Sequence, residues 1–330
     1  MKIGGLDFDT PIFLAPMAGV TDRAYRILAH EMDCPLCAAE MVSAQGIHYR
    51  NDKTLTMLET DPKERPISLQ LFGRSPEMLA EAAAFVENSH FADIIDFNLG
   101  CPAPKIVNNG EGSALMREPK LVFAIVRAMR CAVKLPLTVK MRKGWDLTQI
   151  NAVEIAKICE AAGADALTVH GRTRQEFYSG KADWNIIAEV KRAVKIPVVA
   201  NGDIGSFDDY DRATAATQAD GVAIGRAAQG NPWIFRRLIH YARTGEKLPP
   251  PTVSERGEIM LKHLRLLLKF KGEYIGVREM RKHAAWYTRG LPHGAAWRND
   301  INRAQTYDDF YKIVRKMLYA SEPIFAAPPD

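Results

Sequence analysis

The chain has no apolar run long enough to cross a bilayer, and acidic residues occur close to its N-terminus, before any stretch that could act as a secretory signal. It also has few cysteines. The five cysteines are an odd number at scattered positions, which excludes a disulfide framework and indicates a reducing compartment. We therefore expect a cytoplasmic protein that does not enter a membrane.

The usual signatures of a metal site and of a Rossmann dinucleotide site are missing as well. Cys34 and Cys37 form a Cys-x-x-Cys pair, but no second pair or histidine cluster completes a zinc site. His170 has no acidic or histidine partner at a ligand spacing. No Gly-x-Gly-x-x-Gly follows the first predicted strand. We expect no metal, and we interpret the cysteine pair as structural.

Apolar runs of strand length alternate with segments of helical period over residues 1–243. Such alternation requires parallel strands joined by crossover helices, and eight strands favour closure into a barrel rather than an open sheet. The predicted fold is α/β, a (β/α)8 TIM barrel with a C-terminal helical-bundle domain. The predicted strands are 11–15, 36–40, 67–71, 94–97, 137–141, 166–170, 197–200 and 221–224.

Glycine and prolines at 244–253 predict a linker, and residues 254–330 show only helical period, which predicts a separate helical domain. Residues 251–330 carry 14 Lys and Arg against 9 Asp and Glu, whereas residues 1–250 carry 30 of each. All of the excess positive charge therefore lies in the tail, which points to a polyanion such as nucleic acid. A mildly basic solvated surface is the alternative.

Cations and aromatics alternate in one part of this tail. Arg278, Arg281, Lys282 and Arg289 surround Trp286 and Tyr287. Such mixtures bind phosphates and bases in RNA-binding proteins, although aromatics at helical spacing also form bundle cores. We expect the cations to face outward and the aromatics to face mainly inward.

In a TIM barrel the chemistry is located where the strands end at their carboxyl side. Polar residues follow almost every predicted strand at that point, which stability alone does not explain. They include Gln70, Asn98, Cys101, Lys140, Arg142, His170, Asn201, Asp203 and Arg226.

Three of these residues, Arg226, Lys140 and Cys101, suggest specific roles, the first together with two nearby glycines. Gly202, Gly225 and Arg226, after the last two strands, would expose backbone N–H groups and a guanidinium, as a phosphate site requires. Lys140 could be a Schiff-base amine, a cation beside an anionic ring, or a side chain that extends to solvent. Cys101 lies in a loop stiffened by Pro102 and Pro104, and is either a functional thiol or a small buried hydrophobe.

Taken together, these motifs resemble in order and spacing those of the bacterial tRNA-dihydrouridine synthases, most of all the B-type branch, and the match covers nearly the whole chain. The matching motifs are Ala15–Asp22, Asn98–Pro102, Lys140–Trp145, His170–Thr173, Asn201–Ile204, Gly225–Ala227 and Arg281–Tyr287.

The resemblance implies an enzyme that binds FMN, uses NADPH or NADH as reductant, and saturates the C5–C6 bond of a uridine in the tRNA D-loop. We expect the protein to be a monomer. The resemblance also implies that Cys101 is the proton donor and that Asn98 and Arg142 bind the uracil. Arg278, Arg281 and Lys282 would contact the tRNA. The residues implied to bind FMN are Pro16, Met17, Ala18, Gln70, Lys140, His170, Asn201, Gly202, Asp203, Gly225 and Arg226.

Three alternatives stay open at this point. An FMN-dependent dehydrogenase of free pyrimidines, of the dihydroorotate type, would use the same barrel but would have no use for the basic tail. A class I aldolase would use Lys140 for a Schiff base and would be colourless. An RNA-binding protein built on an inactive barrel would not need the polar residues at the strand ends.

Overall fold

The computed structural model describes residues 1–320, and eight parallel strands form a closed barrel within them. Each strand pairs with the next, and the last pairs back with the first through Ile224 and Leu14. The predicted TIM barrel is confirmed, with every strand at its predicted position. The strands are β3 (Ile12–Leu14), β4 (Cys37–Ala38), β6 (Ile67–Phe72), β7 (Ile94–Leu99), β8 (Leu137–Gly144), β9 (Ala166–Thr173), β10 (Val198–Asn201) and β11 (Gly221–Ile224).

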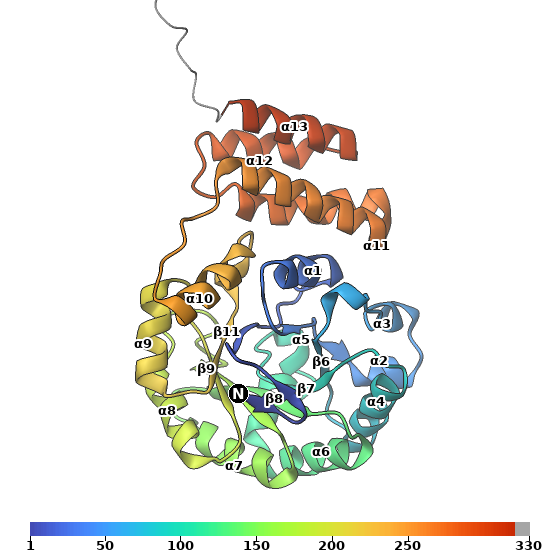
Figure 1. Cartoon of the computed structure of the whole chain (residues 1–330). Helices are drawn as coiled ribbons and strands as arrows, with labels where there is room; N and C mark the ends of the chain where they lie inside the picture. The colour runs from blue at the N-terminus through green and yellow to red at the C-terminus, as the bar shows by residue number, and fades with distance from the viewer. Residues whose placement is uncertain (321–330) are drawn as a thin grey trace, which may run out of the picture. The chain divides into compact units, whose positions relative to one another are not determined.

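Helices form a ring around these strands (Figure 1). Several begin at a side chain that caps the first turn, because an Asp or Ser oxygen accepts a backbone N–H there; Asp22, Ser75 and Asp183 are examples. The ring helices are α1 (Arg23–Glu31), α4 (Pro76–Asn88), α6 (Pro119–Ala132), α7 (Ala152–Ala162), α8 (Trp184–Ala193), α9 (Phe207–Thr217) and α10 (Trp233–Thr244).

Several short elements were not predicted, because two to six residues are too few to show a period. A hairpin of β1 (Lys2–Ile3) and β2 (Leu6–Asp7) precedes the barrel, and β5 (Val42–Ser43) extends the ladder beside β6. The other short elements are α2 (Ala44–His48), α3 (Asp52–Thr56), η1 (Pro62–Glu64), α5 (Pro104–Val107), η2 (Gly112–Arg117) and η3 (Arg226–Ala228).

Side chains on the strands alternate between two environments, as the pleat of a strand requires. One set, including Val139 and Leu167, faces outward and forms the large core beneath the helices. The other set faces into the barrel. At one end of the interior it is apolar, with Ile3 of the hairpin packed against Ile94 and Val199, and toward the carboxyl ends of the strands it becomes polar.

Within the described residues, a second compact unit comprises residues 229–233 and 248–320, while Met1–Ala228 and Ile234–Lys247 form the first. The second unit contains α11 (Val253–Tyr287), which is broken at Gly272, together with α12 (Gly294–Arg303) and α13 (Tyr307–Tyr319). Of these, α12 was not predicted. The functional division into residues 1–243, 244–253 and 254–330 stays a prediction, and its last ten residues lie outside the described part of the chain.

Candidate active site

The loop that carries Cys101 is fixed by the side chain just before it. Asn98, buried near the end of β7, accepts hydrogen bonds through Oδ1 from the backbone N–H groups of Gly100 (3.1 Å) and Cys101 (2.9 Å). From the other side, the Ser113 hydroxyl donates to the carbonyl of Cys101 at 2.8 Å. The thiol is therefore held at a defined place at the barrel mouth.

The Cys101 thiol is half-buried, and burial raises its pKa above the ordinary value. A backbone N–H at Ala103 and the charges of Arg142 and Lys140 act in the opposite direction and only partly offset the burial. The group is consequently a protonated thiol at neutral pH. Such a thiol can give up a proton to a basic carbon but is a poor nucleophile.

Beneath this loop a chain of hydrogen bonds runs down into the barrel. Asn98 Nδ2 donates to Gln70 Oε1 at 2.7 Å, and Gln70 Nε2 donates to Asp96 Oδ2 at 2.6 Å. The other oxygen of Asp96 accepts from the Thr138 hydroxyl at 2.6 Å. Gln70, a predicted cofactor residue, therefore lies between a buried carboxylate and the loop that carries the thiol.

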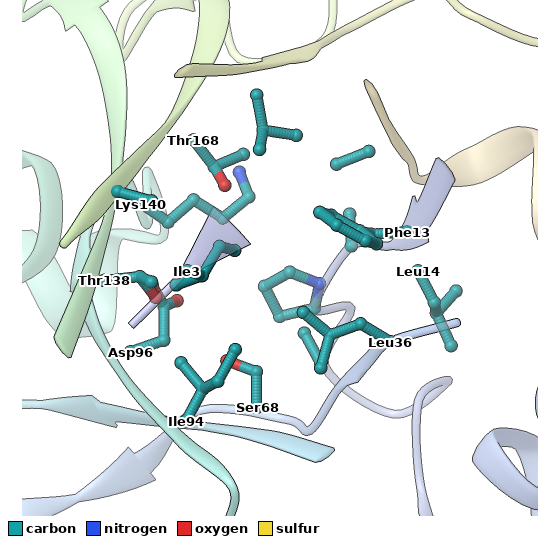
Figure 2. A pocket seen from close by; sticks show the side chains of 16 residues that line it. Ile3, Phe13, Leu14, Leu36, Ser68, Ile94, Asp96, Thr138, Lys140 and Thr168 are labelled. Atoms are coloured by element: carbon teal, nitrogen blue, oxygen red, sulfur yellow. The ribbon is translucent and has the colours of Figure 1, made fainter. Parts of the chain in front are cut away.

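Lys140 lies at the side of a small cavity inside the barrel (Figure 2). Its Nζ donates to Asn201 Oδ1 at 3.1 Å, and Asn201 is held in turn by its Nδ2, which donates to the carbonyl of Ala223 at 2.7 Å. Burial, followed by the charge of Arg142, lowers the pKa of Lys140 to about 8. The ammonium therefore remains mostly charged at neutral pH but titrates far more readily than an ordinary lysine.

His170 is a buried, neutral imidazole. Burial is the main cause that lowers its pKa far below the ordinary range, and the cations Lys140, Arg142 and Arg172 add to the effect. Arg172 Nη1 lies 3.3 Å from Nε2. Because a guanidinium can only donate, Nε2 accepts and the proton is on Nδ1. The ring thus offers a donor on its other nitrogen.

Arg226 and Asp203, both predicted to bind the phosphate end of a cofactor, contact each other. Arg226 Nη2 donates to Asp203 Oδ1 at 3.1 Å, and Asp203 Oδ2 accepts from Arg172 Nη2 at 2.6 Å and from the N–H of Ala182 at 2.7 Å. Both oxygens of the Asp203 carboxylate thus already accept hydrogen bonds from the protein itself. A carboxylate also repels a phosphate, so at this position the backbone, not the side chain, is suited to an anion.

The two predicted glycines differ from each other. Gly202 has φ of +120°, and a Cβ there would lie 2.7 Å from the Cβ of Ala182 and 2.9 Å from Cδ2 of His170. Only glycine fits at this crowded turn. A Cβ on Gly225 would meet nothing within 4 Å, so its backbone faces open space. The segment after Gly225 is the three-residue turn η3.

Arg142 was predicted to bind a substrate base, but its side chain is committed to the protein backbone. Nε donates to the carbonyl of Gly100 at 2.8 Å, and Nη1 donates to the carbonyls of Thr173 and Phe177, both at 2.8 Å. The side chain is buried. In this arrangement Arg142 joins the Cys101 loop to the loop that follows β9.

The end of β9 and the loop that follows it carry two side chains to which the sequence assigned no role. Arg172, 1% exposed, donates to the carbonyls of Ser179 and Gly180. Directly before these anchors, the exposed ring of Tyr178 has its centre 5.0 Å from the guanidinium carbon of Arg226. The only sequence signal was the position of Arg172 at a strand end, because its partners are backbone carbonyls that carry no residue signature.

The N-terminal predicted residues lie on the loop after β3. Pro16 and Met17 are half-buried and Ala18 is exposed. The N–H of Met17 donates to the Thr21 hydroxyl at 3.1 Å, which closes the loop just before α1. Pro16 also lines the cavity that Lys140 lines, so this loop and β8 border the same space.

In the helical unit the predicted cations divide into two groups. Arg278 and Lys282 are exposed, as expected, and Arg278 covers the ring of Tyr274 at 3.5 Å. Arg281 is half-buried, its Nη2 donates to the carbonyl of Ala304 at 2.6 Å, and its Nε is a buried donor with no hydrogen bond to any described residue. The aromatic Tyr287 is 1% exposed. Arg281 is therefore part of the bundle structure, contrary to the outward position expected.

Residues 1–320 contain neither a cluster of metal-ligating side chains nor a membrane-spanning helix. No group of three or more His, Cys, Asp or Glu side chains there is placed to hold a metal ion. No helix in the same range has the length and hydropathy needed to cross a membrane. Cys34 and Cys37 are both buried in the barrel wall.

Comparison with known proteins identifies the family. The sequence model described as Dihydrouridine synthase (Dus) matches residues 13–321. The tRNA-dihydrouridine synthase B of Xanthomonas axonopodis pv. citri is 43% identical over 100% of this chain and 98% of that protein. The tRNA-dihydrouridine synthase B of Pseudomonas aeruginosa is 45% identical over 96% of both chains.

Among solved structures, the histamine dehydrogenase from Rhizobium sp. 4-9 aligns with a TM-score of 0.55 at 12% identity. The alignment covers 81% of this chain and 50% of that one, so this chain spans about half of its length. At this identity the likeness concerns the fold alone. The family model and the close relatives, in contrast, show that this chain belongs to the dihydrouridine synthase family, a family of oxidoreductases, as its motifs predicted.

Proposed function

We propose that this protein is a cytoplasmic tRNA-dihydrouridine synthase that binds FMN, takes electrons from NADPH, and reduces the C5–C6 bond of a uridine in the D-loop of tRNA. The observation that carries the proposal is the protonated Cys101 thiol, fixed at the mouth of a barrel whose strand ends are polar. The names of the relatives support the substrate.

The residues at the mouth fit a flavin mononucleotide. Gly225 leaves its backbone open to an incoming group, and Arg226 brings a cation to the same rim, as a phosphate requires. Gln70, Lys140, His170 and Asn201 would surround the ring and its ribityl chain with hydrogen-bonding groups, and Pro16 to Ala18 would border it. Asp203 would act indirectly, by holding Arg172 and Arg226.

FMN held by these residues would supply hydride chemistry when reduced, and a hydride added at C6 of the uracil would leave negative charge at C5 and O4. Cys101 then donates its thiol proton to C5, and the new C–H bond completes the saturation. Burial favours this role because it keeps the thiol protonated until an acceptor arrives. Lys140 would stabilise negative charge on the ring edge beside it.

Substrate contacts divide between the two units. Asn98 would donate its second Nδ2 hydrogen at the uracil edge near Cys101, because its Oδ1 already accepts the two loop N–H groups. Arg142 would support the walls of the pocket through the carbonyls that it binds. Arg278 and Lys282 would contact phosphates, which position the RNA without reading its sequence. Arg281 would support the helix that carries them.

The family assignment favours this activity over an aldolase or a dehydrogenase of free pyrimidines. The experiment that tests it is incubation of the purified protein with NADPH and tRNA that lacks dihydrouridine, followed by mapping of dihydrouridine along the tRNA. We expect a yellow protein that releases FMN on denaturation and modifies a D-loop uridine. A colourless protein that cannot be reconstituted with FMN, or an untouched tRNA, would contradict the proposal.

A further inference from the structure

Asp96 is a buried carboxylate that no step of the proposed reaction uses. It lies on β7, two residues before Asn98, and lines the cavity inside the barrel beside Thr138 (Figure 2). Both of its oxygens are occupied, Oδ1 by the Thr138 hydroxyl and Oδ2 by the amide of Gln70. Burial raises the pKa of Asp96, and the hydrogen bonds from Thr138 and Gln70 and the charge of Lys140 act in the opposite direction.

The hydrogen bonds between Asp96 and Cys101 have a fixed direction. At the lower end the carboxylate can only accept, and at the upper end the N–H groups of Gly100 and Cys101 can only donate. Between these ends lie two side-chain amides, Gln70 and Asn98, each of which offers one donor side and one acceptor side. If either amide turned over, an NH2 group would face an N–H donor, or a carbonyl would face the carboxylate.

The acceptor at Asp96 therefore determines which way Gln70 points, and Gln70 determines which way Asn98 points. With Gln70 donating downward, its Oε1 is available to Asn98 at 2.7 Å. With Asn98 donating to Gln70, its Oδ1 is left to accept the two loop N–H groups. Gln70 and Asp96 are both deeply buried, so water cannot easily replace a missing partner.

We propose that Asp96 is a positioning residue, which acts through Gln70 and Asn98 to fix the backbone of the Cys101 loop and so the place of the proton donor. The catalytic part of this inference rests on the proposed function. The role requires a hydrogen-bond acceptor at position 96. It does not require a charge or a transferable proton.

This distinction can be tested with two variants of nearly equal shape. Asp96→Asn keeps an acceptor for Gln70, because its NH2 can face Thr138, whose hydroxyl can accept. Asp96→Leu removes the acceptor. In the FMN-loaded Asp96→Asn protein, we expect tRNA to reoxidise the reduced flavin at a rate within about threefold of the wild-type rate. We expect Asp96→Leu to be slower by about 10- to 100-fold, since a small misplacement of a catalytic group has effects of this size.

Hydrogen exchange of the backbone amides gives a readout that needs neither FMN nor tRNA. The amides of Gly100 and Cys101 should exchange faster in Asp96→Leu than in the wild type and should be nearly unchanged in Asp96→Asn. Amides in β9 and β10 should exchange at wild-type rates in both. Thr168→Val is the matched control, because Thr168 lines the same cavity but lies outside the hydrogen-bond chain, and it should leave the loop amides unchanged.

Several results would overturn the proposal. If the rate of flavin reoxidation falls equally in Asp96→Asn and Asp96→Leu, the charge or a proton of Asp96 matters. If the amides of Gly100 and Cys101 exchange at the wild-type rate in Asp96→Leu, the hydrogen bonds through Gln70 and Asn98 do not hold the loop. If Asp96→Leu does not fold, Gln70→Leu breaks the same chain one step higher and must accelerate exchange at the same two amides. A wild-type protein that tRNA cannot reoxidise would refute the proposed function instead, and the exchange experiment would still decide the role of Asp96.

Discussion

Lys140 and Asn201 are joined by a hydrogen bond of 3.1 Å from Nζ to Oδ1, which links β8 to β10 over the intervening strand β9. The contact does not fully compensate for the removal of the ammonium from water, since the pKa of Lys140 remains near 8. A charged lysine is thus maintained at the barrel mouth at a cost to the stability of the fold. Such a cost is typical of a group that serves a ligand.

The first prediction concerns this cost. In the unfolded chain Lys140 has an ordinary pKa of about 10.4, so between pH 8 and pH 10.4 the unfolded state binds more protons than the folded state. Stability should rise with pH through this window, and the penalty should be fully present at pH 7. Lys140→Gln, which keeps a neutral donor, should therefore stabilise the apoprotein at pH 7 and lose most of this advantage by pH 10.

Urea unfolding at the two pH values measures this effect. Lys157→Gln, on the exposed side of α7, is the control and should change little at either pH. If Lys140→Gln raises the free energy of unfolding equally at pH 7 and pH 10, the charged ammonium is not what destabilises the wild-type fold.

The second prediction separates the two half-reactions. Cys101→Ala should bind FMN and accept electrons from NADPH at the wild-type rate, because its side chain is not part of the proposed flavin site. Reoxidation by tRNA should fall by about 10²- to 10⁴-fold, the usual contribution of a general acid. Stopped-flow absorbance of the flavin follows both steps. Cys131→Ser, which alters an exposed cysteine, should leave both unchanged, and normal turnover in Cys101→Ala would remove the thiol from the mechanism.

The third prediction concerns retention of the cofactor. Arg226→Ala should raise the Kd for FMN by about tenfold, the low end for a charge-assisted hydrogen bond, because this guanidinium is half exposed and already paired with Asp203. Fluorescence titration of apoprotein with FMN gives the value. Riboflavin, which lacks the phosphate, should bind the variant and the wild type equally. A variant that lost affinity for both ligands would indicate a disturbed loop and not a lost phosphate contact.

The fourth prediction concerns the basic helix of the second unit. Arg278 and Lys282 are exposed, so their joint replacement by Ala should raise the Kd for tRNA. The slope of log K against log salt should decrease by the amount expected for the loss of about two phosphate contacts. Reduction of the flavin by NADPH should be unaffected. Lys120 and Arg127, exposed on α6 of the barrel, provide a control that removes the same charge elsewhere.

Arg281→Ala should behave differently from that pair. Its guanidinium bonds the carbonyl of Ala304 from a half-buried position, so its removal should lower the stability of the helical unit and leave the salt slope nearly unchanged. If the Arg278 and Lys282 double variant instead retains full affinity and slope, that helix surface does not contact the RNA backbone.

The features that the sequence predicted depend on local patterns along the chain, whereas the features that it missed depend on contacts between residues that are separated along the chain. The barrel strands were predictable because each is an apolar run bounded by polar residues, and the positions of Lys140 and His170 toward the carboxyl ends of β8 and β9 were predictable with them. The roles of Arg142 and Arg172 were not, since both donate to carbonyls of the loop at 173–180. A carbonyl acceptor belongs to every residue, so no sequence pattern marks it.

The same limit explains the error at Arg281. Its outward position was inferred from charge alone, and the acceptor that draws it inward is the carbonyl of Ala304, 23 positions away on the chain. The helix α12, whose last residue precedes that carbonyl, was not predicted. An error in one element thus led to an error in a residue that packs beside it.

The pairing of β3 with β11 has a consequence for synthesis of the chain. Leu14 and Ile224 are 210 positions apart, yet they are partners in the ladder. While the ribosome is still translating the segment between them, the growing sheet has two unpaired edges, and edges of this kind associate with other chains. Closure is possible only after the last strand emerges, so a stalled or truncated product that ends before residue 221 would present both edges to its neighbours and would be prone to aggregate.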